Sequence, residues 1–409
     1  MNYILLAIPL FMLLIMIELA WDKYKGTGYY RLNDTVNSIT MGIYSRLTGL
    51  VYAFIPFSAY VFIFENYQLF ELPIDDSWVW IVAFVVYDFG YYFIHRLGHT
   101  LNITWASHVI HHQSEDYNLG TALRQTSIPS VLGWMCLIPM ALLGFPPVVL
   151  LAAGSFNLIY QFWVHTQHIK KLPKWYEALF VTPSHHRVHH GKNKIYIDKN
   201  HGGVFIVWDK IFGTFQAELE DEKVIYGIST QLASWNPIWG NVQFIGYLIK
   251  DAWLTKSWLD KLTLWFRATG YRPQDLEKTH PRIKTNGIVN KYNITNSTGI
   301  KAYVLSQFIL CLVLVFALLT MAKGLMPWQL ILGVTALGLF LFSLSKVQEE
   351  KDSAVLWELI KFIVLAVSAV TISPNIGWGL PALSAIGLIS ISSLYYLQRQ
   401  REASELVKA

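Results

Sequence analysis

Long uncharged stretches, separated by short polar ones, make up much of this chain. An apolar run begins at Tyr3 and continues past Glu18 to Trp21. Residues 47–64 form a second run of 18 residues without a charged side chain, which is long enough to cross a bilayer as a helix. A third helix is predicted from Ser77 to about His99. These runs indicate membrane-spanning helices.

The middle and the end of the chain repeat the pattern. Residues 125–164 include 40 residues without a charge. The sequence Gly144-Phe145-Pro146-Pro147 interrupts them, which predicts a hairpin of two apolar helices. Residues 170–300 are polar, charged and aromatic, and are predicted to face water. Four closing helices are then expected at 302–322, at 325–345 and in 362–398, the last range being split by Ser373-Pro374-Asn375 and Pro381.

Composition supports lipid as a solvent. Of 409 residues, 54% are hydrophobic and only 14% are charged, whereas average soluble domains are about a quarter charged. The net charge of +5 comes without a long Lys/Arg run, which argues against a nucleic-acid partner. Cys136 and Cys311 lie in apolar stretches and form no CxxC motif. A metal site in this chain would therefore use nitrogen and oxygen ligands.

The distribution of charge between helices predicts an orientation. Basic residues flank one end of the helices in succession, while the loop between the second and third helices is acidic. Basic flanks mark the cytosolic side of a membrane protein. The basic residues are Lys23, Lys25, Arg31, Lys170, Lys171, Lys174, Lys346, Lys351, Arg399 and Arg401, and the acidic ones are Glu65, Glu71, Asp75 and Asp76. Alternating crossings place every basic cluster, and the histidines with them, in the cytosol.

Histidines carry the most specific signal. Twelve of the 13 lie between positions 95 and 201, mostly in pairs or triplets spaced by three or four residues. That spacing places side chains on one helical face. The clusters are His95 and His99; His108, His111 and His112; His165 and His168; and His186, His189 and His190.

Neutral imidazole is the commonest metal ligand in proteins. A lone histidine on an apolar face is usually an ordinary core residue, but four clusters in about 100 residues favour metal binding. Ten ligands are too many for one ion and suit two, and the excess over the four of a structural zinc site favours catalysis. Zinc, copper, iron and nickel all remain open on these grounds. His185 and His201 are ambiguous, and His280 is interpreted as a surface residue.

Two divalent ions held by neutral imidazoles need negative charge nearby. Asp88 precedes His95 by seven residues and His99 by eleven, so that all three lie on one helical stripe within about 20°. Asp88 is therefore a candidate to orient a metal-binding histidine. The alternative is a helix-end carboxylate that faces water or pairs with Arg96. Glu115 is a weaker candidate for the same role.

Asn157 and Gln161 follow the same logic. They precede His165 by eight and four residues on an otherwise apolar helix. Polar residues at such depth generally face protein or a cavity. They are expected to hydrogen-bond the histidines or to line a substrate channel, and simple helix–helix contacts are the alternative.

Three segments resemble the fatty acid hydroxylase/sterol desaturase superfamily of membrane di-iron enzymes. They are residues 88–99 (DFGYYFIHRLGH), 105–112 (WASHVIHH) and 184–190 (SHHRVHH). The resemblance covers roughly residues 30–220. It implies that His95, His99, His108, His111, His112, His165, His168, His186, His189 and His190 bind two iron ions, which activate O₂.

A narrower resemblance is to the alkylglycerol monooxygenase branch. Residues 197–215 (IDKNHGGVFIVWDKIFGTF), residues 222–227 (EKVIYG) and the extra C-terminal helices carry it, although His201 stands where a tyrosine is expected. This branch cleaves ether lipids with tetrahydrobiopterin as reductant. The alternatives are a sterol, fatty-acid or carotenoid hydroxylase or desaturase that uses an electron-transfer protein, and a metal transporter. A transporter would place its polar ligands in mid-membrane rather than at helix ends.

These observations predict an all-α, multi-pass transmembrane bundle with a histidine-rich di-metal cap in the cytosol. Three parts are expected: a membrane-embedded fatty acid hydroxylase-like catalytic domain (1–225), a cytosolic amphipathic and aromatic connector (226–300), and a four-helix transmembrane region (301–409). The substrate would be a lipid from the bilayer, with its head group near Arg124, Lys192 and Asn193. Electrons would come from outside the chain. The expected location is a bacterial inner membrane or the endoplasmic reticulum.

Overall fold

The computed structural model describes residues 3–129, 132–282, 290–373 and 379–408. Their regular structure is helical, apart from two isolated β-bridges, which confirms the predicted all-α class. The chain divides into two compact units. The first comprises Met1–Ile39, Tyr52–Leu232 and Asn241–Lys291, and the second comprises Thr40–Val51, Ala233–Gly240 and Tyr292–Ala409.

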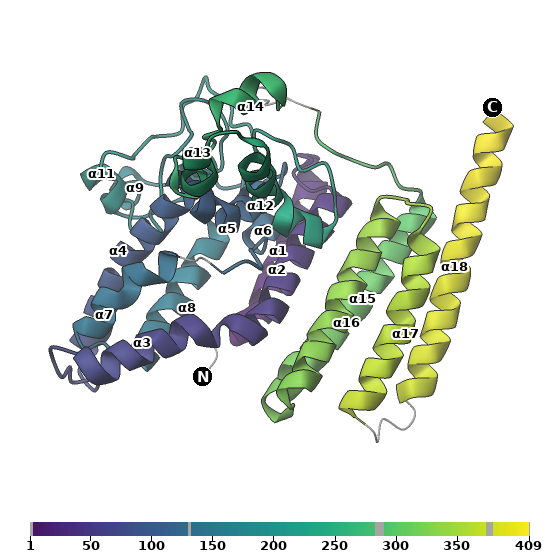
Figure 1. The fold of residues 1–409 in the computed structure, drawn as a ribbon, viewed down its shortest axis with the longest axis horizontal. Helices are drawn as coiled ribbons and strands as arrows, with labels where there is room; N and C mark the ends of the chain where they lie inside the picture. The colour runs from purple at the N-terminus through teal and green to yellow at the C-terminus, as the bar shows by residue number, and fades with distance from the viewer. Residues whose placement is uncertain (1–2, 130–131, 283–289, 374–378, 409) are drawn as a thin grey trace. The chain divides into compact units, whose positions relative to one another are not determined.

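The first unit holds most of the short helices (Figure 1). Their bounds are α1 Tyr3–Lys25, α3 Phe54–Tyr67, α4 Ser77–Thr100, α5 Asn102–His112, α6 Leu119–Ala122, η1 Gly133–Leu137, α7 Ile138–Leu142, α8 Pro147–Trp163, α9 Lys174–Leu179, α10 Pro183–His189, α11 Val207–Ile211, α13 Trp258–Thr263, η2 Leu264–Phe266 and α14 Gln274–Thr279. Two helices, α2 (Leu32–Tyr52) and α12 (Pro237–Leu254), have residues in both units.

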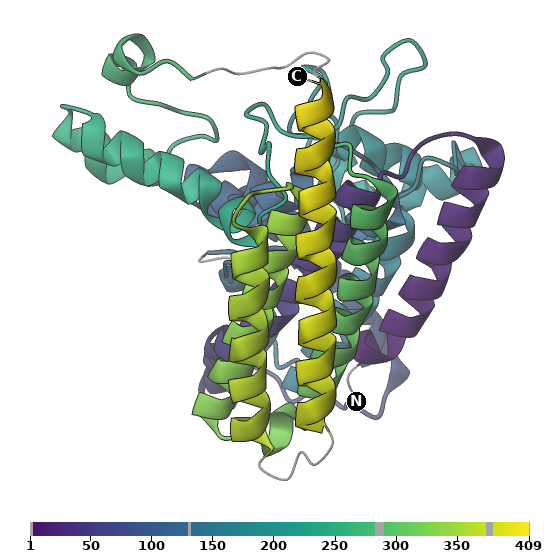
Figure 2. The same cartoon turned by 90° about the vertical axis from the view of Figure 1, so that its right-hand side faces the viewer.

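The second unit is dominated by four long helices that lie side by side (Figure 2). They are α15 (Thr298–Met321), which continues into η3 (Ala322–Gly324), α16 (Pro327–Gln348), α17 (Ala354–Ile372) and α18 (Gly379–Lys408). The prediction of four closing helices is therefore confirmed. Of the residues predicted to separate the last two, Pro374 and Asn375 lie outside the described residues, whereas Pro381 lies in the first turn of α18.

Five helices in the described residues are long and apolar enough to cross a membrane: α4, α15, α16, α17 and α18. The pair α2 and α3, bent by 51°, qualifies as one further span. The sequence predicted one straight helix over 47–64, but the helix breaks at Ala53. Pro56 explains the break, because it lacks an N–H and its ring would collide with the carbonyl of Tyr52 in a continuous helix.

The predicted hairpin over 125–164 is only partly confirmed. Its second arm is α8, but its first arm shrinks to η1 and α7, a helical stretch of ten residues from Gly133 to Leu142. The turn between the arms is as predicted. Gly144 has a φ of 87°, and a Cβ there would lie 1.9 Å from the carbonyl oxygen of Phe70. Only glycine fits this turn.

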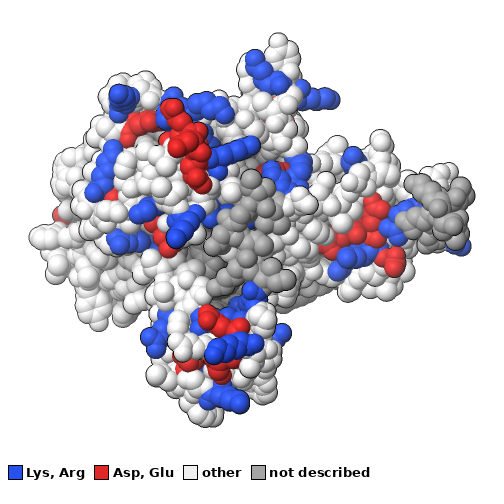
Figure 3. Space-filling model, turned by 90° about the horizontal axis from the view of Figure 1, so that it is seen from above, with Lys and Arg blue, Asp and Glu red and all other residues white. Residues whose placement is uncertain are grey.

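The turn fixes the position of α8 against α4. Buried Val79 and Ala83 of α4 pack with Met140 of α7 and Val149 of α8, and the Tyr60 hydroxyl donates to the Phe145 carbonyl at 2.8 Å. Because α8 leads directly into His165 and α4 carries His95 and His99, this apolar cluster sets the distance between two parts of the histidine set. The face seen in Figure 3 carries many charged side chains.

A polar network lies inside the second unit. Lys361 and Glu358 of α17 are fully buried, with Nζ and Oε2 2.5 Å apart. Lys361 also donates to Gln307 of α15 at 2.9 Å, and Ser343 of α16 donates to Glu358 at 2.7 Å. Gln307 in turn donates to Ser390 of α18 at 2.9 Å. One ion pair thus connects all four long helices.

Removing one partner of this pair should destabilise the second unit strongly. Glu358→Ala would leave Lys361 buried without its carboxylate, which costs roughly 3–5 kcal/mol. The double variant Glu358→Leu/Lys361→Met removes both charges and should cost less. Thermal unfolding of the detergent-purified protein measures the difference. Lys351→Met, which loses only a half-exposed lysine 4.0 Å from Glu349, is the control and should change little. A single variant as stable as the double would contradict the network's role.

Candidate metal centre

Nine of the ten histidines that were predicted to bind metal lie in two groups in the first unit. They come from the C-terminal end of α4, from α5, from the residue two positions after α8, and from α10 with the residue that follows it. The first group is His95, His99, His108, His112 and His189; the second is His111, His165, His186 and His190. Within each group, one ring nitrogen from every histidine lies within 4.8 Å of those of the others. Histidines adjacent in sequence thus belong to different groups. His111 and His112 are divided in this way, and so are His189 and His190.

Hydrogen bonds fix the tautomer of several rings. The Nδ1 atoms of His111 and His165 lie 2.9 and 2.8 Å from the carbonyls of Arg124 and Gln161, so that Nδ1 must carry the proton. The Nε2 atoms of the two rings are then both acceptors, yet they face each other at 3.2 Å. Two facing lone pairs need a cation between them. Nitrogens about 2.0–2.1 Å from a shared metal ion lie roughly 3 Å apart.

The same distances recur in both groups. Nε2 of His186 lies 3.0 Å from that of His165, and Nε2 of His95 lies 3.0 Å from that of His108. Among the described residues, the buried Nε2 atoms of His99 and His189 have no hydrogen-bond partner. Unpaired buried nitrogens are costly in an apolar setting. A metal ion in the first group would satisfy both, and one in the second group would separate the facing Nε2 atoms of His111 and His165, so the donor set fits two ions.

Burial keeps the rings uncharged. It lowers the pKa of His111 to about 4, and it lowers the pKa values of His112, His186 and His190 well below their ordinary range. These imidazoles are neutral at pH 7, which is the form that binds metal.

Asp88 binds a loop next to the histidines. Its carboxylate accepts hydrogen bonds from the backbone N–H groups of Val204 and Phe205, at 2.8 and 3.0 Å, and from the Trp208 indole at 2.9 Å. It thereby fastens the loop that begins at His201, whose carbonyl lies 2.8 Å from Nδ1 of His95. Asp88 therefore contacts the loop that holds His95 rather than a histidine, and its role in orienting that ring stays a prediction.

The residues of that loop are tightly confined. A Cβ on Gly203 would lie 2.8 Å from Asp88 and 3.0 Å from Asn157. Asp209, which the sequence did not single out as a site residue, accepts from the backbone N–H groups of His201 and Gly202, both at 2.7 Å. Its only sequence signal was its place in the 197–215 motif. Two buried carboxylates thus hold one loop.

Asn157 and Gln161 extend the Asp88 network. Asn157 donates to Asp88 and Gln161 donates to Asn157, both at 2.6 Å, while the Tyr91 hydroxyl donates to Gln161 at 2.7 Å. The backbone carbonyl of Gln161, rather than its side chain, lies next to His165. This network joins α4 to α8, so the helix–helix alternative describes the two side chains better than direct contact with the histidines does.

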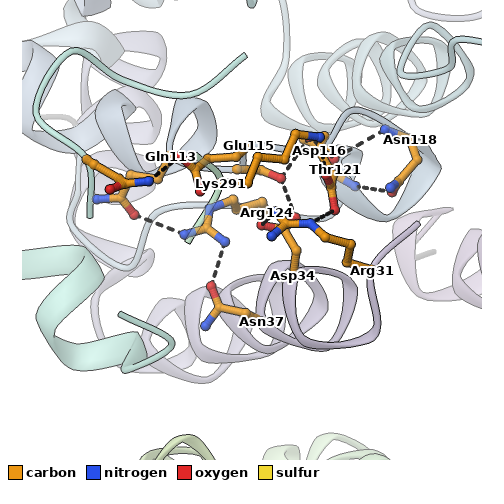
Figure 4. A network of polar contacts seen from close by, with 12 residues as sticks. Arg31, Asp34, Asn37, Gln113, Glu115, Asp116, Asn118, Thr121, Arg124 and Lys291 are labelled. Atoms are coloured by element: carbon orange, nitrogen blue, oxygen red, sulfur yellow. Dashed lines mark hydrogen bonds and ion pairs between the residues drawn. The ribbon is translucent and has the colours of Figure 1, made fainter. Parts of the chain in front are cut away.

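A second network surrounds the end of α5 (Figure 4). Arg124 is fully buried and donates to Asn37 at 2.6 Å, to Gln113 at 3.1 Å and to the Ile110 carbonyl at 2.7 Å. These contacts position its own carbonyl, which accepts from His111. Arg124 is therefore a structural residue, and the hypothesis that it holds a lipid head group is wrong.

The remaining candidates lie apart from the two groups. His168 points elsewhere, with Nε2 3.9 Å from Asp22. Glu115 accepts from Gln231 at 2.7 Å. His185 is buried beside Phe215, and His280 is exposed. The His201 ring lies beside His99, with ring centroids 5.1 Å apart, but its nitrogens are outside both groups.

Two groups of buried imidazoles, with His95 and His99 at the end of the candidate span α4, are features expected of a membrane metal-dependent hydroxylase. In agreement, a fatty acid hydroxylase family model matches residues 80–214. The chain is 38% identical to alkylglycerol monooxygenase of Homo sapiens, over 89% of this chain and 81% of that protein. It is 36% identical to the enzymes of Danio rerio (100% and 91%) and Xenopus tropicalis (89% and 81%). No solved structure matches.

The chain belongs to the alkylglycerol monooxygenase family. It is an oxygen-dependent lipid monooxygenase of the membrane. The transporter alternative is thereby excluded.

The Asp88 loop gives a test of positioning. Asp88→Asn keeps the side-chain size but replaces an acceptor with a donor, so that N–H groups of the loop lose a partner. Because the His201 carbonyl then shifts, metal affinity should fall roughly 10–100-fold. Metal titration monitored by competition with a chelator measures this. Glu115→Gln, outside both groups, is the control and should keep its affinity; equal affinities in the two variants would contradict the positioning role.

Proposed function

We propose that this protein cleaves ether lipids by hydroxylating the carbon beside the ether oxygen of an alkylglycerol, with a reduced pterin as the electron donor. The observation that carries the proposal is the similarity to alkylglycerol monooxygenases, which extends over 89% of the chain for the Homo sapiens enzyme and over the whole chain, C-terminal helices included, for that of Danio rerio. The histidine groups supply a site suited to the reaction. The Ile197–Phe215 segment, which that similarity covers, forms the loop that holds His95.

The nine converging histidines are proposed to hold two iron ions. Bound iron would supply the activation of O₂ that hydroxylation of an unactivated C–H bond requires. The protein's own part is to fix tautomers through backbone carbonyls, to keep the rings neutral by burial, and to exclude water. Asp88 and Asp209 hold the loop that contains the His201 carbonyl, which lies next to His95. The contacts of Arg124 position its own carbonyl, which accepts from His111. His168 is left outside this proposed set because the structure places it apart.

The reaction balances with two electrons from outside. One oxygen atom enters the C–H bond, and the other leaves as water with two protons and the two electrons. Hydroxylation beside an ether oxygen gives a hemiacetal, which collapses to a fatty aldehyde and a free glycerol hydroxyl. The protein therefore needs only to place one carbon.

The location of the site supports substrate entry from the bilayer. Because His95 and His99 lie at the end of α4, a candidate span, we expect the lipid chain to approach the histidine groups from the bilayer. Following the basic flanks, we assign this end to the cytosol, in a bacterial inner membrane or the endoplasmic reticulum. Residues 1–225 form the proposed catalytic domain, 226–300 the connector and 301–409 the closing membrane region.

Metal content should report the two groups separately. Protein produced with ample iron is expected to bind about two ions per chain, because nine ligands suit two sites. His189→Ala, in the first group, and His190→Ala, in the second, should each lose about one ion and all activity. Elemental analysis of purified protein measures this. His168→Ala and His280→Ala are the matched controls and should keep both ions. Loss of metal in the controls alone would overturn the assignment.

Substrate and electron donor can be tested together. Membranes containing the protein, supplied with an alkylglycerol that bears a free hydroxyl, reduced pterin and O₂, should release a fatty aldehyde that mass spectrometry detects. Omitting the pterin or O₂ should abolish the product. A hydroxylated sterol, carotenoid or acyl chain, made with ferredoxin-type electrons and without pterin, would refute the ether-lipid proposal and leave the metal assignment intact.

A further inference from the structure

One surface of the first unit exposes large apolar side chains. On the last turns of α12, Leu248 and Asp251 are buried, as is Thr255 directly after the helix, while Ile249 and Trp253 are 56% and 82% exposed. The exposed pair is spaced by four residues and so forms an apolar outer stripe. A helix that faces water carries polar residues on its outer face. The segment reverses this rule.

The stripe continues through the next two helices. Trp258, Leu259 and Leu262 of α13 are 76%, 64% and 71% exposed, and Phe266 of η2 is 58% exposed. Their spacing again places them on one face, whereas Leu264 beneath them is fully buried. We call these six side chains (Ile249, Trp253, Trp258, Leu259, Leu262 and Phe266) the apolar face.

Positive charge borders the apolar face. Lys250, Lys256 and Arg267 are exposed. The acidic groups of the segment are engaged internally: Asp251 binds Arg282 at 2.8 Å, and Asp260 accepts from the Tyr271 hydroxyl at 2.6 Å. Exposed Trp, Leu and Phe bordered by Lys and Arg are typical of segments that lie in the interface of a bilayer with anionic lipids.

The segment is held in place rigidly. Lys261 donates to the carbonyls of Ala252 and Trp253, both at 2.9 Å, and so closes the corner between α12 and α13. Figure 2 shows α12 projecting sideways as an arm. An apolar stripe on such an arm needs a broad, flat partner rather than a groove.

The position of the segment identifies that partner. Asn102, fully buried at the α4–α5 corner, donates to the Leu264 carbonyl at 2.9 Å and accepts from the Gly270 N–H at 3.0 Å. The Thr269 N–H donates to the carbonyl of Thr100, the last residue of α4. Because α4 is a candidate span, its end marks the level at which hydrocarbon gives way to head groups. The apolar face is fastened to that level.

We propose that residues 249–267 form an interfacial anchor, whose apolar face inserts into the lipid monolayer on the side of the histidine groups. Tryptophan is enriched at this depth. Through Asn102 the anchor holds the corner between His99 and His108 at the membrane surface. This inference concerns lipid contact and does not depend on the reaction catalysed.

Depth-dependent fluorescence quenching tests the anchor. In a Cys136→Ser background, a single cysteine is introduced by Leu262→Cys and labelled with an environment-sensitive fluorophore. Cys311 is fully buried, and unlabelled parent protein checks that it stays unreactive. The protein is placed in nanodiscs of phosphatidylcholine and phosphatidylglycerol that carry a spin label on the upper acyl chain. Glu277→Cys, on exposed and acidic α14, is the matched control.

The label at 262 should emit at shorter wavelength than the label at 277 and be quenched roughly threefold more strongly by the spin-labelled lipid. Equal, weak quenching at both positions would show that the face contacts water and would overturn the anchor. A blue-shifted label at 262 that lipid does not quench, with energy transfer between labelled chains, would show that a second copy covers the face and would overturn it as well. Each result is read without any assay of activity.

Discussion

The first unit depends on one constraint, which is that lone pairs on histidine nitrogens face one another. Backbone carbonyls accept hydrogen bonds from the Nδ1–H groups of His111 and His165. The two Nε2 atoms, which then carry lone pairs, lie 3.2 Å apart inside a buried site. Such an arrangement is repulsive until a cation is shared. Polar networks fix the position of these carbonyls. The apolar packing of α4, α7 and α8 in turn fixes the helices that carry the networks.

The fold was predictable wherever the signal was local. Uncharged runs located the four closing helices and α4, because hydrophobic length alone decides whether a segment spans a bilayer. The bend at Ala53 and the short first arm before Gly144 were missed. A proline near a helix start and a helix of ten residues leave little trace in an uncharged run. The buried pair of Glu358 and Lys361 was also missed, because one Glu and one Lys at a helix end look like an ordinary solvated flank.

At the site, the spacing correctly placed histidines on α4, α5 and α10, but the pair His165 and His168 lies beyond the end of α8 rather than on a helical face. Spacing gave no means to see that His111 and His112, adjacent in sequence, turn to different groups, or that His168 turns away from both. Asp88 is buried, but its role in orienting a histidine stays a prediction. Its contact with a loop 116 residues further along the chain depends on tertiary packing, which a helical periodicity cannot encode.

The bond between His95 and the His201 carbonyl has a consequence for biosynthesis. His95 leaves the ribosome 106 residues before its acceptor. The two helices that carry the first five clustered histidines, α4 and α5, are therefore synthesised before His165, His186, His189 and the Asp88-bound loop. An ion captured at that stage would meet an incomplete ligand set and exchange readily. The two histidine groups are thus complete only after synthesis has reached His190, and the loop that holds His95 is complete only after Asp209.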